Sequence, residues 1–290
     1  MDYIWNITGK CNLQCQYCWD IFKNTAEVDT DQAKSVIDHI TEDPCNMLLF
    51  TGGEPLIRDD LFDLIHYSKR HGVKYIKICT NGLLISKRIE EIKAAPISEI
   101  HISLDSIEDD SNDYRKKNFQ VLQNIKVLLQ NVDLQKTKIV LVSVIDFHRL
   151  YKFESVLKFA KENGIYVTYQ LPASIDNHKL SLNIEHIQVE QLNSLFLSLH
   201  EYHRQYSKQI DYFANFYLLI AEKYYLEGKI PEQCQAGIGF QIISPIGEYY
   251  SCYTCKKRTV SLKECFNSKC LVWFRSNGRS QKLLKMLKTP

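Results

Sequence analysis

Apolar residues in the first 172 positions fall into short runs that alternate with longer amphipathic stretches. Runs rich in Val, Ile and aromatic residues are typical of strands, and apolar spacings of three and four residues are typical of helices. The predicted strands cover residues 3–8, 46–51, 73–80, 98–104, 138–145 and 165–171. The predicted helices cover residues 31–40, 60–71, 86–94, 113–132 and 150–163. Gly72 and Gly164 stand where the second and fifth of these helices should end.

Six strands with five intervening helices predict a parallel sheet with right-handed crossovers, in the α/β class. An incomplete (β/α)6 barrel and a doubly wound sheet both satisfy this pattern. In both folds ligands collect at the carboxyl ends of the strands. Polar segments follow the first four predicted strands, at residues 9–20, 52–55, 81–82 and 103–105. We therefore expect these four segments to share one rim.

The alternation of strands and helices stops after about residue 173. Residues 186–228 predict two helices, the second with an aromatic stripe that we interpret as core. Residues 240–244 and 248–251 predict a β-hairpin that turns at Gly247, and residues 280–288 predict a short basic helix. The expected organisation is a core of residues 1–185, a helical bridge of residues 186–230 and a small domain of residues 231–290.

The composition is that of an ordinary globular protein, with 45% apolar residues, 24% charged residues and a formal net charge of +2. This small net charge does not favour binding to nucleic acid or to membrane surfaces. No apolar run approaches the ~20 residues that span a bilayer, and the N-terminus lacks a signal-peptide layout. We expect a cytoplasmic protein without a nucleic-acid or membrane partner.

Ten cysteines are unusual in such a chain. Disulfides are rare in a reducing compartment, so clustered cysteines more often bind metal or carry out redox chemistry. Cys45 and Cys79 stand alone, and we interpret them as small core residues. The other eight form one group near each end of the chain: Cys11, Cys15 and Cys18, then Cys234, Cys252, Cys255, Cys265 and Cys270.

The first group follows the first predicted strand in a C-x3-C-x2-C pattern. A loop that brings three thiolates together supplies one ligand fewer than a four-iron cluster usually takes, which leaves one iron open to a small molecule. A zinc site with a distant fourth ligand is the alternative. The second predicted strand ends in Thr51-Gly52-Gly53-Glu54-Pro55, where two glycines permit close backbone approach and a carboxylate can accept bonds from an ammonium.

Together these two segments resemble the radical S-adenosylmethionine (radical SAM) superfamily, with its C-x3-C-x-aromatic-C signature and glycine-glycine-glutamate motif. The resemblance implies a partial (β/α)6 barrel core. It implies that Cys11, Cys15 and Cys18 hold a [4Fe-4S] cluster. It also implies that Gly52, Gly53, Glu54 and Pro55 bind the amino group of S-adenosylmethionine.

Further cofactor-binding positions follow from the same resemblance. Asn81, Ser103 and Asp105 are expected to contact the carboxylate or ribose of S-adenosylmethionine. Tyr17 is expected near the adenine, and Trp19 over the cluster. Ser143 and Gln170 could extend this lining or be ordinary satisfied polar groups on their strands.

The resemblance also implies a mechanism. An external one-electron donor such as flavodoxin or ferredoxin reduces the cluster, and the cluster passes the electron to the bound sulfonium. Methionine leaves, and a 5′-deoxyadenosyl radical takes hydrogen from the substrate.

The second cysteine group places twelve residues between Cys234 and Gly247 and four between Gly247 and Cys252. This resembles the opening of SPASM and twitch extensions, which carry auxiliary iron–sulfur clusters. Five cysteines favour the shorter twitch form with one auxiliary [4Fe-4S] cluster, with a structural zinc ribbon as the rival interpretation. The implied ligands are Cys234, Cys252, Cys265 and Cys270.

Cys255 is then left over. It could exchange with Cys265 as a ligand, or it could be catalytic and return a hydrogen atom to the substrate radical.

Two sets of charged or titratable residues receive a structural interpretation. His101 and His148 are expected to be satisfied structural histidines rather than pocket groups. Arg115, Lys116 and Lys117 are expected to form a solvated helix face.

The sequence thus predicts a radical SAM oxidoreductase or isomerase, and the first-ranked function is epimerisation or crosslinking of a ribosomally synthesised peptide. Against a peptide, we expect no peptide-recognition domain before the first predicted strand, since only Met1 and Asp2 precede that strand. The alternative is a dehydrogenase or epimerase of a small molecule, such as an aminoglycoside sugar, in antibiotic biosynthesis. A non-enzymatic electron-transfer or zinc-binding module ranks lower, because it has no use for a sulfonium site.

Overall fold

The computed structural model describes residues 1–251 apart from 19, 112, 114, 172, 177–178, 183–188 and 228–238. Its main sheet has eight strands in the order β10-β9-β1-β2-β3-β4-β5-β6. The strands of this sheet are β1 (Asp2–Thr8), β2 (Met47–Gly52), β3 (Tyr75–Thr80), β4 (Glu99–Ser103), β5 (Lys138–Val144), β6 (Tyr166–Gln170), β9 (Phe240–Ile243) and β10 (Tyr249–Tyr250). A separate hairpin consists of β7 (Ala173–Asp176) and β8 (Lys179–Leu182).

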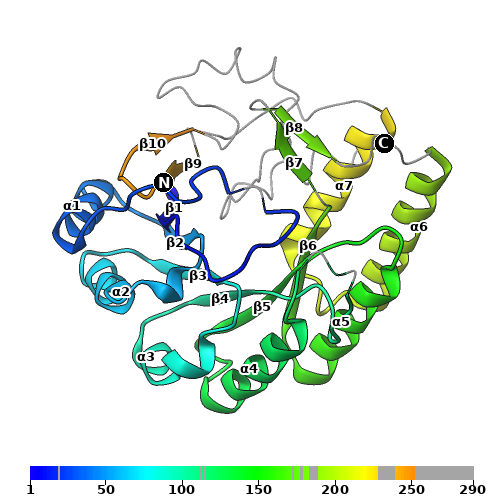
Figure 1. Ribbon diagram of the computed structural model, residues 1–290, viewed down its shortest axis with the longest axis horizontal. Helices are drawn as coiled ribbons and strands as arrows, with labels where there is room; N and C mark the ends of the chain where they lie inside the picture. The colour runs from blue at the N-terminus through cyan, green and yellow to red at the C-terminus, as the bar shows by residue number, and fades with distance from the viewer. Residues whose placement is uncertain are drawn as a thin grey trace.

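Helices follow the parallel strands in turn. They are α1 (Thr30–Thr41), α2 (Leu61–Arg70), α3 (Ile89–Ala94), α4 (Asn118–Asn131), α5 (Leu150–Asn163), α6 (Val189–Gln205) and α7 (Tyr212–Glu227), with short 3-10 turns at Pro55–Ile57 and Ile85–Arg88. Figure 1 shows α1 to α5 along one face of a curved sheet, with α6 and α7 continuing the arc. A doubly wound sheet would carry helices on both faces, so the fold is the partial (β/α)6 barrel.

The six predicted parallel strands and the first five helices are confirmed, with one large boundary error. The fourth helix begins at Asn118 and not at 113, because the preceding residues form a loop that ends with Lys117 at φ +67°. The hairpin β7–β8 was not predicted. Residues 280–288 lie outside the described part of the chain.

The predicted hairpin at Gly247 is present, with β9 and β10 antiparallel. Its pairing with β1 in the main sheet was not predicted. Strand β9 pairs in parallel with β1, from Asp2 beside Phe240 to Trp5 beside Ile243. The Trp5 indole and the Asn6 amide also donate to carbonyls of this late segment, at 3.2 and 3.4 Å. The hairpin therefore closes the first edge of the sheet and holds the strand that leads into the cysteine loop.

The two faces of the sheet bury different cores. Trp5, Ile7 and Phe50 pack outward into a large cluster with the helices. Ile4 and Leu49 face the barrel interior together with Phe22 and other buried apolar residues. This alternation is the period-two pattern of strands that are buried on both faces.

An ion-paired cluster occupies the barrel interior below the strand ends. Lys77 Nζ and His101 Nε2 lie 2.9 and 2.8 Å from Glu99 Oε2. Lys77 and His101 are each only 4% exposed, so His101 is a buried structural histidine.

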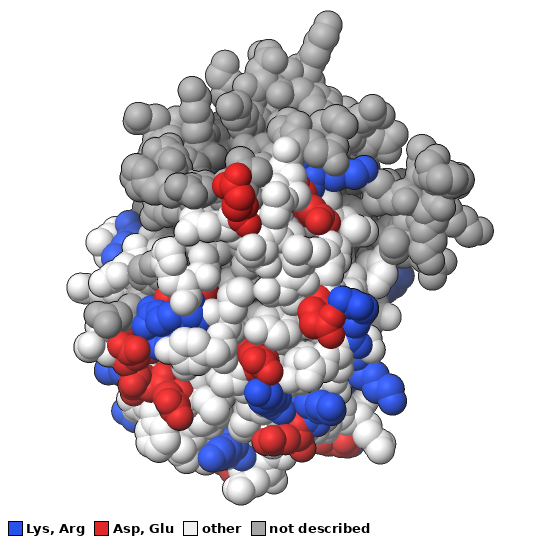
Figure 2. All heavy atoms as spheres, turned by 90° about the vertical axis from the view of Figure 1, so that its right-hand side faces the viewer, with Lys and Arg blue, Asp and Glu red and all other residues white. Residues whose placement is uncertain are grey.

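The molecule does not present a surface of one charge on its α5–α6–α7 side. Figure 2 shows acidic and basic side chains interspersed over the described part of this face. None of the described helices combines the length and the apolar character that crossing a bilayer requires.

Glu99→Gln should lower the stability of the fold at neutral pH. Burial disfavours the charged form of Glu99, but His101 and Lys77 outweigh it and hold the pKa of this carboxyl well below its usual range. A carboxyl with a depressed folded-state pKa stabilises above its unfolded pKa of about 4.3, and that stabilisation is lost as the pH falls below it. We expect the free energy of unfolding to fall by about 3 kcal/mol at pH 7. Denaturant titrations at a series of acidic pH values should also show that this free energy depends less on pH than in the unchanged protein. Glu90→Gln, on the exposed side of α3, is the control, and equal losses in both variants would contradict the ionic role.

Candidate functional site

The end of β2 is clamped to the root of the cysteine loop. Gly53 N donates to Thr8 O at 2.9 Å, and Glu54 N donates to Lys10 O at 2.8 Å. Gly52 has φ +122°, and a Cβ there would lie 2.4 Å from Thr8 O. A Cβ on Gly53 would lie 2.0 Å from Lys10 O. The two glycines are therefore required because the backbones touch.

The Glu54 carboxylate is fully buried and engaged by the protein itself. It accepts hydrogen bonds from Thr80 Oγ1 at 2.7 Å, Asn81 N at 2.6 Å and Leu56 N at 3.0 Å. Burial raises the pKa of Glu54, although these three bonds favour the charged form. Its position ties the end of β3 to the end of β2.

Asn81 carries this connection into the cysteine loop. Its Nδ2 donates to Asn12 Oδ1 at 2.6 Å and lies 3.8 Å from Cys11 Sγ. Its Oδ1 accepts from Leu83 N at 3.0 Å, which fixes the orientation of the amide.

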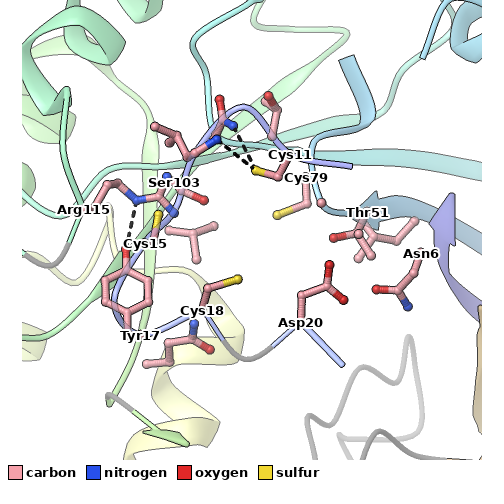
Figure 3. A pocket seen from close by; sticks show the side chains of 18 of the residues that line it. Asn6, Cys11, Cys15, Tyr17, Cys18, Asp20, Thr51, Cys79, Ser103 and Arg115 are labelled. Atoms are coloured by element: carbon pink, nitrogen blue, oxygen red, sulfur yellow. Dashed lines mark hydrogen bonds between the residues drawn. The ribbon is translucent and has the colours of Figure 1, made fainter. Parts of the chain in front are cut away.

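The three cysteines lie on one loop and face one cavity. A turn closed by Cys18 N on Cys15 O at 3.1 Å brings the last two together. Figure 3 shows the thiols of Cys11, Cys15 and Cys18 around the same space. Burial raises the pKa of the Cys11 and Cys15 thiols, and the nearby Arg115 opposes the shift at Cys15.

The cavity has a volume of about 230 Å³ and opens at the carboxyl ends of the strands. Nine of the sequence-predicted site residues line it: Cys11, Cys15, Tyr17, Cys18, Gly52, Gly53, Asn81, Ser103 and Gln170. The predicted residues Glu54, Pro55, Asp105 and Ser143 are not among the lining residues and lie behind them. Trp19, Cys234, Cys252, Cys255, Cys265 and Cys270 lie outside the described residues.

The residues behind the lining brace it. Asp105 accepts from Val144 N at 2.8 Å and from the Tyr17 hydroxyl. Burial raises the pKa of Tyr17 well above its usual value, and Asp105 adds to the effect. Ser143 is fully buried and donates to Leu104 O at 2.7 Å.

Arg115 is a site residue that the sequence analysis assigned wrongly. It does not lie on a solvated helix face but is 8% exposed and lines the cavity. Its Nε donates to the Tyr17 hydroxyl at 2.9 Å (Figure 3). Its Nη1 is buried and has no hydrogen-bond partner among the described residues. Burial opposes the charge of Arg115, but Tyr17 and Asp105 more than compensate and raise its pKa.

The loop that carries Arg115 is anchored by ion pairs. Asp113 pairs with Lys152 and, at 3.3 Å, with Arg149, and Asp110 accepts from both cations at 3.2 Å. Asp113 and Lys152 are 6% and 7% exposed. This network replaces the helical turn that the sequence predicted, and apolar periodicity carries no signal for it.

Five further lining residues that carry a polar or thiol group were also missed: Asn6, Asp20, Thr51, Cys79 and Thr80. Cys79 was expected in the core but is half-buried, and Figure 3 shows its thiol facing the cavity. Burial raises the pKa of Asp20. Asp20 lies at the end of the cysteine loop, whereas the others lie on strands, where only the sheet register could have identified them.

The donor set suits a cluster. Three thiols on one wall are the ligands that iron–sulfur clusters use. Among the described residues, no three His, Cys, Asp or Glu side chains are close enough to hold a single metal ion. A four-iron cube is wider than one ion and takes ligands that stand further apart.

Comparison with known proteins agrees with this site. Residues 5–148 match the sequence profile of the Radical SAM superfamily. A Methanosarcina barkeri protein named Fe-coproporphyrin III synthase is 36% identical over 118 residues, which cover 39% of this chain and 29% of that protein. A GTP 3′,8-cyclase of Alkaliphilus metalliredigens is 38% identical over 111 residues, covering 36% and 35% of the two chains. The matches thus span about a third of these relatives.

Solved structures show the same fold at low sequence identity. Streptococcus suis SuiB aligns with a TM-score of 0.65 at 16% identity, over 87% of this chain and 60% of SuiB. The structure titled native anSMEcpe with bound AdoMet aligns with a TM-score of 0.61 at 16% identity, over 97% and 85% of the two chains.

Glu54→Gln tests the side-chain hydrogen bonds that tie the end of β2 to the end of β3. An amide has one acceptor oxygen, so its NH2 group would face one of the three donors that Glu54 now satisfies. We expect the free energy of unfolding to fall by about 2 kcal/mol in denaturant titrations of the metal-free protein. Glu162→Gln, on exposed α5 surface, should change it little. A Glu54 variant as stable as this control would show that these hydrogen bonds do not stabilise the fold.

Proposed function

The chain belongs to the radical SAM superfamily, and from this premise we propose that it cleaves S-adenosylmethionine reductively to abstract hydrogen from a substrate in the cavity. One observation carries the proposal. The three-cysteine loop and the glycine-glycine-glutamate turn, 30 or more residues apart in sequence, are joined by backbone hydrogen bonds at the mouth of one cavity.

Cys11, Cys15 and Cys18 would hold a [4Fe-4S] cluster and leave one iron for S-adenosylmethionine. When bound, the cluster supplies the electron that splits the sulfonium into methionine and a 5′-deoxyadenosyl radical. The protein binds and orients the cofactor and the substrate, and it excludes water from the site. An external one-electron donor of the flavodoxin or ferredoxin type would serve this site.

In this proposal, different residues of the site contact or support different parts of S-adenosylmethionine. The backbone beside Gly52 and Gly53 approaches the amino group, while Glu54 and Pro55 hold that backbone in place. Asn81 orients the loop beside Cys11. Arg115 offers its unpaired Nη1–H to the carboxylate.

The remaining predicted contacts concern the nucleoside. Ser103 lies in the lining, where it could reach the ribose, and Gln170 lies in the same lining on β6. Tyr17 would pack near the adenine, held by Asp105. Ser143 would act indirectly, through its bond to the backbone of Leu104.

We also propose an auxiliary [4Fe-4S] cluster on Cys234, Cys252, Cys265 and Cys270, with Cys255 as a hydrogen donor or alternative ligand. The described chain supports the location. Tyr250 packs against Phe22 of the cysteine loop, with ring centroids 5.5 Å apart, and Cys252 follows two residues later in sequence. The last described residues before Cys252 thus lie beside the cysteine loop.

The proposed substrate is a peptide, modified by epimerisation or crosslinking. It is supported by the shared fold of SuiB, solved with its precursor peptide SuiA, and of anSMEcpe, solved with a peptide. A small-molecule substrate is the second candidate, because the sequence relatives are named for a porphyrin synthase and a GTP cyclase. Free thiols and a reduced cluster favour a reducing, cytoplasmic setting.

The cluster sites can be tested by counting iron. Anaerobically reconstituted protein should hold about eight iron atoms, two four-iron clusters. Joint replacement of Cys11, Cys15 and Cys18 by Ala should remove about four and abolish 5′-deoxyadenosine release. Cys45→Ala, in the buried core, should retain the full count. About four irons in the unchanged protein would contradict the auxiliary cluster, and full iron in the triple variant would contradict the cysteine assignment.

Arg115→Lys tests the carboxylate contact. The charge stays, but the planar fork that reaches both Tyr17 and the cavity is lost. We expect S-adenosylmethionine to bind the cluster-loaded variant about tenfold more weakly in equilibrium dialysis. Arg70→Lys, at the exposed end of α2, is the matched control. Equal affinity in the two variants would rule out the contact.

A further inference from the structure

The cavity has an acidic corner, formed by Asp20, Asn6 and Thr51. Figure 3 shows the Asp20 carboxylate pointing into the cavity beside Thr51 and Asn6, on the side away from Arg115. Asp20 Oδ1 accepts from Phe22 N at 2.9 Å. Asp20 Oδ2 is buried and has no hydrogen-bond partner among the described residues. A buried carboxylate oxygen without a donor is costly, so this one is poised for a donor on a ligand.

The orientation of Asp20 is fixed by the turn that follows it. Phe22 is 7% exposed and packs against the inner core of the barrel. Lys23 N donates to Asp20 O at 3.3 Å, and Thr25 Oγ1 donates to Phe22 O at 2.6 Å. The carboxylate is thus held in place before any ligand arrives, as a binding group should be.

The walls beside Asp20 change from apolar to polar towards the strand ends. Ile4 pairs in register with Leu49, and Asn6 pairs with Thr51 two residues further along β1 and β2. All four line the cavity. The corner therefore offers an apolar surface that leads to polar groups and a carboxylate. A cation held at Asp20 can therefore rest the hydrocarbon part of its stem against Ile4 and Leu49.

We propose that the acidic corner binds a primary ammonium or guanidinium on an aliphatic stem of the substrate. The inference rests on the proposed function, because it takes this cavity as the substrate site. Asp20 accepts the charge-assisted bond, and Asn6 and Thr51 add polar contacts. A lysine or arginine side chain of a peptide and a free alkylamine share this chemistry.

The test compares charged and uncharged probes on the cluster-loaded protein with S-adenosylhomocysteine present. One pair is the capped tripeptides Ala-Lys-Ala and Ala-norleucine-Ala, and the other is pentylamine and pentanol. Anaerobic equilibrium dialysis gives the dissociation constants. We expect the charged member of at least one pair to bind about tenfold more tightly, and the preferred pair identifies a peptide or a free amine.

Asp20→Asn should reduce this preference to about twofold or less, because the neutral amide loses the charge-assisted bond but keeps the shape. Asp63→Asn, on exposed α2 surface, should keep it. No preference in the unchanged protein, or a preference that survives in Asp20→Asn, would overturn the inference. Release of 5′-deoxyadenosine by the same preparation is measured separately, so loss of the proposed function is distinguishable from loss of the acidic corner.

Discussion

The site depends on the contact between the end of β2 and the root of the cysteine loop. Two backbone hydrogen bonds, from Gly53 N and Glu54 N, extend the β1–β2 pairing beyond the strands. They can form only because Gly52 and Gly53 lack a Cβ. Glu54 then turns inward and binds the end of β3, so three strand ends are fixed by one turn. The same turn fixes the root of the loop that carries the three cysteines.

The cavity that results has a basic group on one side and an acidic group on another. Arg115 presents an unpaired N–H on one side and Asp20 an unpaired oxygen on another, each fixed from behind. Arg115 is held by a loop that Lys152 and Arg149 anchor through Asp113, and Asp20 by a turn that the buried Phe22 anchors. Both groups lie in loops, where binding residues on a rigid scaffold are usually found. A zwitterionic cofactor and a cationic substrate group would find complementary partners there.

The sequence predicted the parallel strands and the cysteine loop because each has a local signature, whereas the barrel, as against a doubly wound sheet, followed from the family resemblance. Period-two and helical patterns report the strands and helices, and the glycines and cysteines report close approach and metal chemistry. Arg115 was assigned wrongly, because burial by ion pairs from α5 leaves no periodic trace. Cys79 and Thr51 were missed because their exposure depends on which strand face meets the cavity. The pairing of β9 with β1 joins residues more than 230 apart, and no local pattern encodes such a contact.

We propose above all that S-adenosylmethionine binds in this cavity directly to a cluster held by Cys11, Cys15 and Cys18. Electron–nuclear double resonance of the reduced, reconstituted protein tests it most directly, with S-adenosylmethionine labelled with ¹⁵N at the amino group and ¹⁷O at the carboxylate. We expect hyperfine coupling of both labels to the cluster spin. We also expect both couplings to be lost in the variant without the three cysteines. Reduced protein that shows saturable S-adenosylmethionine binding but neither coupling would contradict this proposal.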